Sequence, residues 1–186
     1  MKTFWGGLVL GLAVFPLLVI AYLLSGHAPA AVADRPAPLE PFLAGAALSA
    51  RIHREAPQRD LASFTDADLL AGANVYRRSC GCHGLPDSPR RGPRPVMFPP
   101  APGLFTPDGY VTDDPVGVSY WKVKNGIRLS AMPSFKLVLS DEQMWQVAAL
   151  VAKADRLPKE ALDVLKQPPV PAPAAAPPAS PTKPPK

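Results

Sequence analysis

The stretch that decides the fold is Ser79-Cys80-Gly81-Cys82-His83-Gly84. It holds both cysteines of the 186-residue chain, two positions apart, and a histidine follows the second cysteine directly. Thiols and imidazoles are side chains that bind metals and react as nucleophiles. Because Cys80, Cys82 and His83 are so close in sequence, we predict that the chemistry of the chain is concentrated here.

The spacing is one residue short of the motif that attaches c-type haem, which reads Cys-x-x-Cys-His. With about 100° per helical residue, a step of three returns a side chain near its starting face, whereas a step of two does not. Ser79 stands three positions before Cys82 and cannot form a thioether. We therefore expect Cys82 to be the firmer haem attachment. Cys80 reaches a second vinyl group only if Gly81 lets the backbone open, so one or two thioethers are both compatible with the sequence.

Three other chemistries fit the same residues. Cysteines two apart can form a strained, oxidising disulfide, as in a periplasmic dithiol/disulfide exchanger. Cys80, Cys82 and His83 can bind Zn or Cu if a fourth ligand joins them. The third alternative is a purely structural anchor protein whose motif is degenerate and carries no haem. A disulfide exchanger usually needs βαβ-like strands, and the sequence has no strand-like alternation.

The segment from Leu61 to Leu157 has the pattern of helices separated by irregular chain, which predicts an all-α domain. Three helices have clear signals at their ends, and the first of them runs towards the cysteines. The signals in chain order are Thr65 with Asp66 and Asp68, then Asp114-Pro115 and Asn125-Gly126, then Ser140 with Gln143.

A proline-rich stretch separates the first two of these helices, and no regular structure is expected in it. Its prolines are Pro86, Pro89, Pro93, Pro95, Pro99, Pro100 and Pro102. Long connections without secondary structure are uncommon in a compact domain unless something else organises them. A haem would do so, with apolar side chains of this stretch around its ring. The candidates are Met97, Phe98, Leu104, Phe105 and Tyr110.

Several short motifs surround the cysteines at the spacings of a known protein family. They are Gly72, Val75-Tyr76, Cys80-Gly81-Cys82-His83-Gly84, the run Tyr120-Trp121-Lys122-Val123-Lys124-Asn125-Gly126-Ile127-Arg128, Met132-Pro133 and a final helix bearing Trp145. From about Pro41 to Pro158 the chain resembles class I cytochrome c, and more narrowly its membrane-anchored, mono-haem bacterial type. It departs from that family between the cysteines, where one residue is missing.

The resemblance implies a class I cytochrome c-like haem domain behind an N-terminal transmembrane helix. It also implies one covalent haem c on Cys80 and Cys82, with His83 and Met132 as the axial ligands of the iron. A methionine sulfur opposite histidine raises the reduction potential, which suits an electron carrier better than an oxygen binder. The resemblance implies an electron carrier and not an enzyme, either by itself or as a subunit of a respiratory oxidoreductase complex. Met97 is the second choice for the sixth ligand. The implied partners are redox proteins, such as a terminal oxidase or another respiratory complex.

The segment from Phe4 to Leu24 is apolar, uncharged and, at about 1.5 Å per residue, long enough to cross a bilayer. Lys2 precedes it, so the positive-inside tendency predicts a cytoplasmic N-terminus and a periplasmic haem domain at the bacterial inner membrane. The alternative is a secretory signal cleaved near Ala31-Val32-Ala33. Because a signal usually has an apolar core of only about 7 to 15 residues, we expect a single-pass anchor.

The expected organisation has four parts. They are a transmembrane anchor at 1–26, a Pro/Ala-rich spacer with a short helix at 27–60, the cytochrome c domain at 61–158 and a Pro/Ala-rich disordered tail at 159–186. The net charge of +5 is spread along the chain without a basic helix face, which argues against nucleic acid as a partner. Six basic residues are candidates for steering an acidic redox partner. They are Arg90, Arg91, Arg94, Lys122, Lys124 and Arg128.

Overall fold

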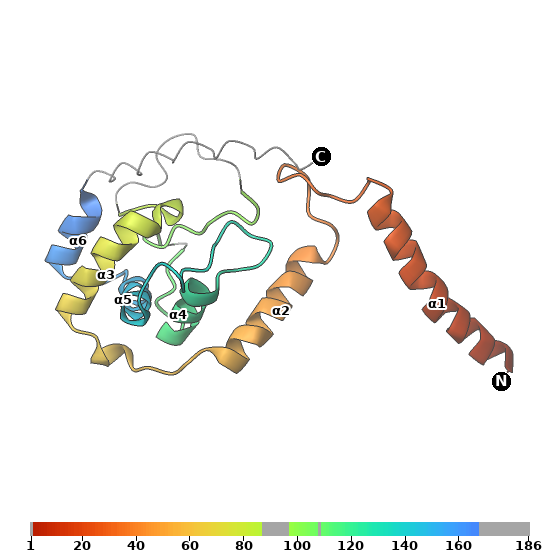
Figure 1. Cartoon of the computed structure of the whole chain (residues 1–186), viewed down its shortest axis with the longest axis horizontal. Helices are drawn as coiled ribbons and strands as arrows, with labels where there is room; N and C mark the ends of the chain where they lie inside the picture. The colour runs from red at the N-terminus through yellow and green to blue at the C-terminus, as the bar shows by residue number, and fades with distance from the viewer. Residues whose placement is uncertain (1, 87–96, 108, 168–186) are drawn as a thin grey trace, which may run out of the picture.

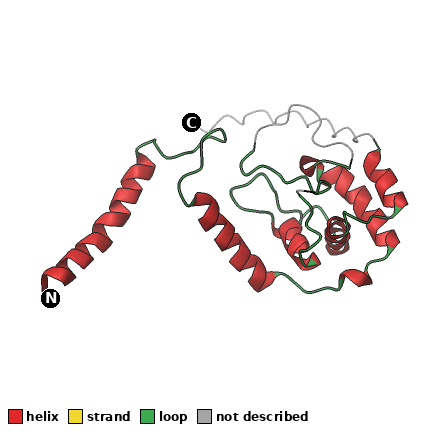
Figure 2. Cartoon of the chain, turned by 180° about the vertical axis from the view of Figure 1, so that it is seen from behind, coloured by secondary structure: helices red, strands yellow, loops and turns green. Residues whose placement is uncertain are grey.

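The computed structural model describes residues 2–86, 97–107 and 109–167. This part of the chain is helix and loop, with no strand element (Figure 2). The helices are α1 Lys2–Leu24, α2 Glu40–Glu55, α3 Asp66–Ser79, α4 Val116–Asn125, α5 Asp141–Ala152 and α6 Lys159–Lys166, with 3-10 turns at Leu61–Ser63 and Gly81–His83. The predicted all-α fold is confirmed.

The core lies where α3 packs against α5, with α4 on α5 and α6 on α3 (Figure 1). Gly72 allows α3 and α5 to approach closely, because a Cβ atom there would lie 2.4 Å from the carbonyl oxygen of Gln146. Tyr120 of α4 stacks on Trp145 of α5 with ring centroids 4.0 Å apart. Leu69 and Leu150 are almost completely buried, and each such side chain stabilises the fold by about 1.5–3 kcal/mol.

Local sequence signals set the helix ends. The Thr65 hydroxyl accepts a hydrogen bond from the Asp68 N–H at 3.3 Å, and the Asp68 carboxylate accepts one from the Thr65 N–H at 2.9 Å. Ser140 and Gln143 form the same capping box at the start of α5. Both predicted caps are confirmed. Pro115 is the N-cap of α4 and not its first helical residue, so this helix begins one position later than expected.

Helix α6 corrects the predicted boundary of the tail at residue 159. Its eight residues, Lys159–Lys166, are helical, and Ala161 and Leu165 are fully buried in the core. These two side chains lie four residues apart on one helix face, which packs on α3. The domain therefore extends through Lys166. The rest of the predicted tail, 168–186, lies outside the described residues.

The C-terminal end of α2 is fastened to α4. Ile52 is 5% exposed, and the Trp121 Nε1–H donates to the Glu55 carboxylate at 3.2 Å. Just after α2, the carbonyl oxygen of Pro57 lies so close to Gly117 that a Cβ atom on Gly117 would be 1.8 Å from it. The spacer predicted at 27–60 thus includes a helix whose last turn is part of the folded domain.

Helix α1 lies outside the helical domain (Figure 1). Within it, Phe4–Leu24 is long and apolar enough to cross a membrane, and none of this span is buried by the rest of the protein. An apolar helix left uncovered in this way is suited to lipid and not to water. It is a candidate membrane span of the chain.

Candidate haem-binding site

The cysteine motif begins where α3 ends. Cys80 is the C-cap of α3, and its N–H donates to the Tyr76 carbonyl at 2.8 Å. Gly81–His83 form a 3-10 turn that ends at Gly84, whose φ of 82° is a left-handed conformation that glycine adopts without strain. The Tyr76 hydroxyl donates to the Gly84 carbonyl at 3.0 Å. Tyr76 of α3 thus hydrogen-bonds to Cys80 before the turn and to Gly84 after it.

The proline-rich segment orients the imidazole of His83. Its Nδ1 lies 3.0 Å from the carbonyl oxygen of Pro102. Because a carbonyl oxygen only accepts hydrogen bonds, Nδ1 donates, and in the neutral ring Nε2 is then the atom with the lone pair. Histidines that ligate metals usually show this arrangement. The surroundings of His83 therefore fit an iron ligand that binds through Nε2.

The two thiols have different surroundings. Cys80 is buried among the core side chains, whereas Cys82 is exposed. Burial raises the pKa of Cys80 to about 12, and the neighbouring charge of Cys82 adds to the effect. A thiol with so high a pKa is protonated at neutral pH and is a weak nucleophile. The two-residue spacing thus places one cysteine inside and the other at the surface.

The described part of the proline-rich segment packs on α3 without forming a helix or strand. The Phe105 ring meets the edge of Tyr76 with centroids 5.1 Å apart. Leu104 and Phe105 both pack against the hydrophobic core. Because the Tyr76 hydroxyl also donates a hydrogen bond to the Gly84 carbonyl, this aromatic contact links the proline-rich segment to the cysteine turn.

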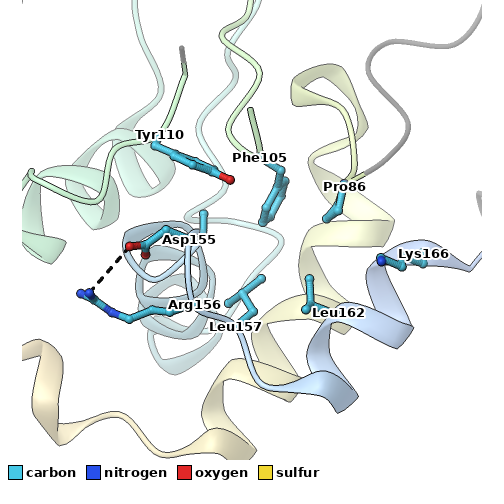
Figure 3. Close-up of a pocket in the computed structure, with 9 residues that line it drawn as sticks. Pro86, Phe105, Tyr110, Asp155, Arg156, Leu157, Leu162 and Lys166 are labelled. Atoms are coloured by element: carbon cyan, nitrogen blue, oxygen red, sulfur yellow. Dashed lines mark ion pairs between the residues drawn. The ribbon is translucent and has the colours of Figure 1, made fainter. Parts of the chain in front are cut away.

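Phe105 and Tyr110 also line an open hollow beside α6 and the residues that follow α5 (Figure 3). Its other lining residues are Pro86, Ala154, Asp155, Arg156, Leu157, Leu162 and Lys166. The cysteines, His83 and Met132 do not line this hollow. Two of the residues expected to surround the haem ring therefore face the C-terminal helices.

Met132 lies in a loop that is fastened to the end of α4. The Ile127 N–H donates to the Met132 carbonyl, and the Phe135 N–H donates to the Val123 carbonyl, both at 3.1 Å. Gly126, with φ 69°, ends the helix against this loop, and a Cβ atom there would lie 2.8 Å from the Met132 carbonyl oxygen. The Met132 side chain is half-buried and packs against the hydrophobic core. The loop is thus held firmly enough to present a sulfur ligand.

The basic residues before Met132 are largely paired with carboxylates. Lys122 Nζ lies 3.8 Å from Asp114, and Lys124 Nζ lies 3.4 Å from Asp141. Lys124 also donates to the Tyr120 hydroxyl at 2.7 Å, and this hydrogen bond is the main cause of its raised pKa. These pairings reduce the positive field expected there. Arg128, the third predicted basic residue before Met132, is exposed in the turn after α4. Arg90, Arg91 and Arg94 lie outside the described residues.

The geometry disfavours two of the alternative chemistries. Among the described residues, no three His, Cys, Asp or Glu side chains converge as metal ligands, so the structure does not gather Cys80, Cys82 and His83 into one cluster. The high pKa of buried Cys80 is the opposite of the lowered thiol pKa that a disulfide exchanger uses. An oriented histidine and an exposed cysteine next to it fit covalent haem better.

The sequence did not reveal the residues that position the predicted ligands. The Pro102 carbonyl has no side-chain signal, and its approach to His83 depends on the path of the proline-rich segment. Ser134, whose hydroxyl donates to the Lys124 carbonyl at 2.6 Å, also fastens the Met132 loop. The glycine of the Asn125-Gly126 pair was recognised as a helix end, but not as the point where this loop packs on α4.

Residues 67–151 match the model of the family described as "Cytochrome C oxidase, cbb3-type, subunit III". No solved structure matches the chain. The matched segment runs from the first turn of α3 to the last turn of α5, and it includes the cysteine motif and Met132. The chain therefore carries a class I cytochrome c-like domain that binds c-type haem covalently and serves in electron transfer.

Proposed function

We propose that this protein carries electrons within a bacterial respiratory chain by means of one haem c. Cys82 would attach the haem covalently, and His83 and Met132 would ligate its iron. The observation that carries the proposal is the 3.0 Å contact between His83 Nδ1 and the Pro102 carbonyl, because it makes Nε2 the nitrogen with the lone pair, as in histidines that ligate metals. The match of residues 67–151 to an oxidase-subunit family supports the respiratory role.

Bound haem supplies an iron that alternates between ferric and ferrous states without breaking a substrate bond. The residues of this chain hold it, orient its ligands and exclude water. Pro102 fixes the ring of His83, while α4 and Gly126 fix the loop of Met132. A rigid ligand set favours electron transfer, because little rearrangement then accompanies the change of charge.

Cys82 is the better candidate for the thioether because its thiol is exposed and directly precedes His83. Cys80 lies in the core, and burial raises its pKa to about 12, which lowers its reactivity as a nucleophile. Cys80 would form a second thioether only if the core opened around it. We therefore propose a single thioether as the native attachment.

We place the haem domain in the periplasm, anchored by one pass of α1 through the inner membrane. Lys2 before the apolar span supports this orientation. The electron partner is a redox protein such as a terminal oxidase. The loop of Met132 offers such a partner the exposed apolar side chains of Leu129, Leu137 and Val138, which are 92%, 88% and 71% exposed.

The test is respiration-driven redox cycling of the haem in membranes. The full chain is produced in a bacterium that matures c-type cytochromes, and its α-band is followed while a respiratory substrate and then oxygen are supplied. We expect reduction by the substrate and reoxidation by oxygen. A Cys80→Ser/Cys82→Ser double variant is the control for the host's own cytochromes. A haem that is attached but is neither reduced nor reoxidised would contradict the respiratory role.

A further inference from the structure

Helix α2 has two apolar faces, and the folded domain uses only one of them. Ile52 is buried and Leu48 is half-buried, and they lie one turn apart on the face that contacts the domain. Phe42 and Leu43 are 71% and 59% exposed. They begin what we term the outer stripe, which consists of Phe42, Leu43, Ala46 and Ala50. With about 100° per helical residue, the outer stripe is centred about 130° around the helix axis from Ile52.

The outer stripe belongs to the half of α2 that is nearest the anchor. Between Leu39 and Ala50 the only charged residue is Glu40, and Leu39 itself is 67% exposed. Contiguous exposed apolar side chains of this kind mark an interaction surface. The packing of the domain accounts for Ile52 but leaves the outer stripe uncovered.

The linker between α1 and α2 is folded back on itself. The Tyr22 hydroxyl donates to the His27 carbonyl at 3.5 Å, and the Asp34 carboxylate accepts hydrogen bonds from the N–H groups of Ala30 and Ala31 at 3.0 and 2.8 Å. Tyr22, in the last turn of α1, lines the same hollow as Pro38, just before α2. The first turn of α2 therefore lies near the point where the anchor leaves the bilayer.

The charges around the outer stripe suit a lipid surface. Exposed basic side chains lie on the linker at Arg35 and at the far end of α2 at Arg51, His53 and Arg54. An apolar stripe with basic residues beside it is the pattern of helices that lie in the headgroup region of anionic membranes. Arg51 and Arg54 both pair with the one carboxylate of Glu55, so two positive charges face one negative charge and this end of α2 stays net positive.

We propose that the outer stripe of α2 lies in the boundary between headgroups and acyl chains of the membrane that α1 spans. Because the last turn of α2 is fastened to α4 through Ile52 and Trp121, this contact holds the haem domain beside the bilayer. The inference rests on the proposed anchoring by α1. It adds a second, peripheral membrane contact that fixes the height and orientation of the domain.

The experiment is photocrosslinking of the full haem-loaded chain in vesicles of phosphatidylethanolamine and phosphatidylglycerol. A benzophenone amino acid replaces Phe42 or Leu43 in the outer stripe. The matched control places it at Ala44, which is exposed in the same half of α2 but lies outside the stripe. A second control places it at Phe15 within the anchor, and the haem spectrum of every variant verifies folding.

We expect lipid adducts, seen as a mass increase of one phospholipid, at positions 42, 43 and 15, and much weaker labelling at 44. Adducts at 15 but not at 42 or 43 would overturn the inference and leave the anchor intact. Crosslinks from 42 or 43 to a second copy of the chain would also overturn it. Absence of adducts at 15 as well would show that the anchoring itself is wrong.

Discussion

At the scale of single residues, the site depends on how its neighbours restrict His83, Cys80 and Met132. The Pro102 carbonyl selects the tautomer of His83, and the core buries Cys80 and raises its pKa to about 12. Gly126 lets the Met132 loop pack on α4. The residue types were readable from sequence because the motif is local. Their surroundings were not, because the proline-rich segment and the core bring them together from distant positions.

Replacing Met132 with alanine tests the sixth ligand. Loss of the sulfur ligand is expected to lower the reduction potential by on the order of 100 mV, within the range of about 0.8 V that axial ligands span. Potentiometric titration of the full chain measures this. Met97→Ala is the matched control and should leave the potential unchanged. If Met97→Ala lowered it and Met132→Ala did not, the ligand assignment would be reversed.

At the scale of secondary-structure elements, helix ends were predictable wherever capping is local. Thr65 with Asp68 and Ser140 with Gln143 form the expected capping boxes, since each needs only residues three positions apart. The sequence did not predict helix α6, because a proline-rich tail follows it. The burial of Ala161 and Leu165 becomes evident only when the helix is packed on α3. Short helices stabilised by tertiary packing leave a weak signal in sequence.

The capping box of α3 gives the domain an acid-sensitive contribution to stability. The backbone hydrogen bond from Thr65, and then its hydroxyl, lower the pKa of Asp68 below 3.8. This contribution is therefore fully present above pH 3.8 and is lost as the pH falls through the lower, folded-state pKa. Asp68→Asn should reduce the loss of stability at acid pH, measured as the pH dependence of the thermal unfolding midpoint. If the unfolding midpoint fell with pH as steeply in the variant as in the unchanged protein, Asp68 would not be the cause of the acid sensitivity.

Gly117 tests the attachment of α2 to the domain. Alanine there would place its Cβ 1.8 Å from the Pro57 carbonyl oxygen, so α2 or α4 must move. We expect Gly117→Ala to cost about 1–3 kcal/mol in unfolding free energy and to expose residues 56–60 to protease. Gly45→Ala is the matched control, because a Cβ there meets nothing within 4 Å. Equal stability of the two variants would contradict this contact.

At the scale of the whole molecule, the chain combines an apolar helix long enough to cross a membrane, helix α2 with its outer stripe, and a small haem domain. The order of these parts was predictable from composition, since the apolar span and the proline-rich linkers differ plainly from the domain. How they are joined was not predictable, because the contact of Glu55 with Trp121 links positions far apart in sequence. This contact fastens α2, which follows the proposed anchor, to the haem domain.

The most direct measurement is covalent haem retention in single-cysteine variants of the full chain. Haem staining on denaturing gels and the pyridine haemochrome spectrum report whether haem is attached and through how many thioethers. We predict that Cys80→Ser keeps the haem with a single-thioether spectrum and that Cys82→Ser loses it. The unchanged protein should show the same single-thioether spectrum. Loss of haem in Cys80→Ser with retention in Cys82→Ser would contradict the attachment proposed here.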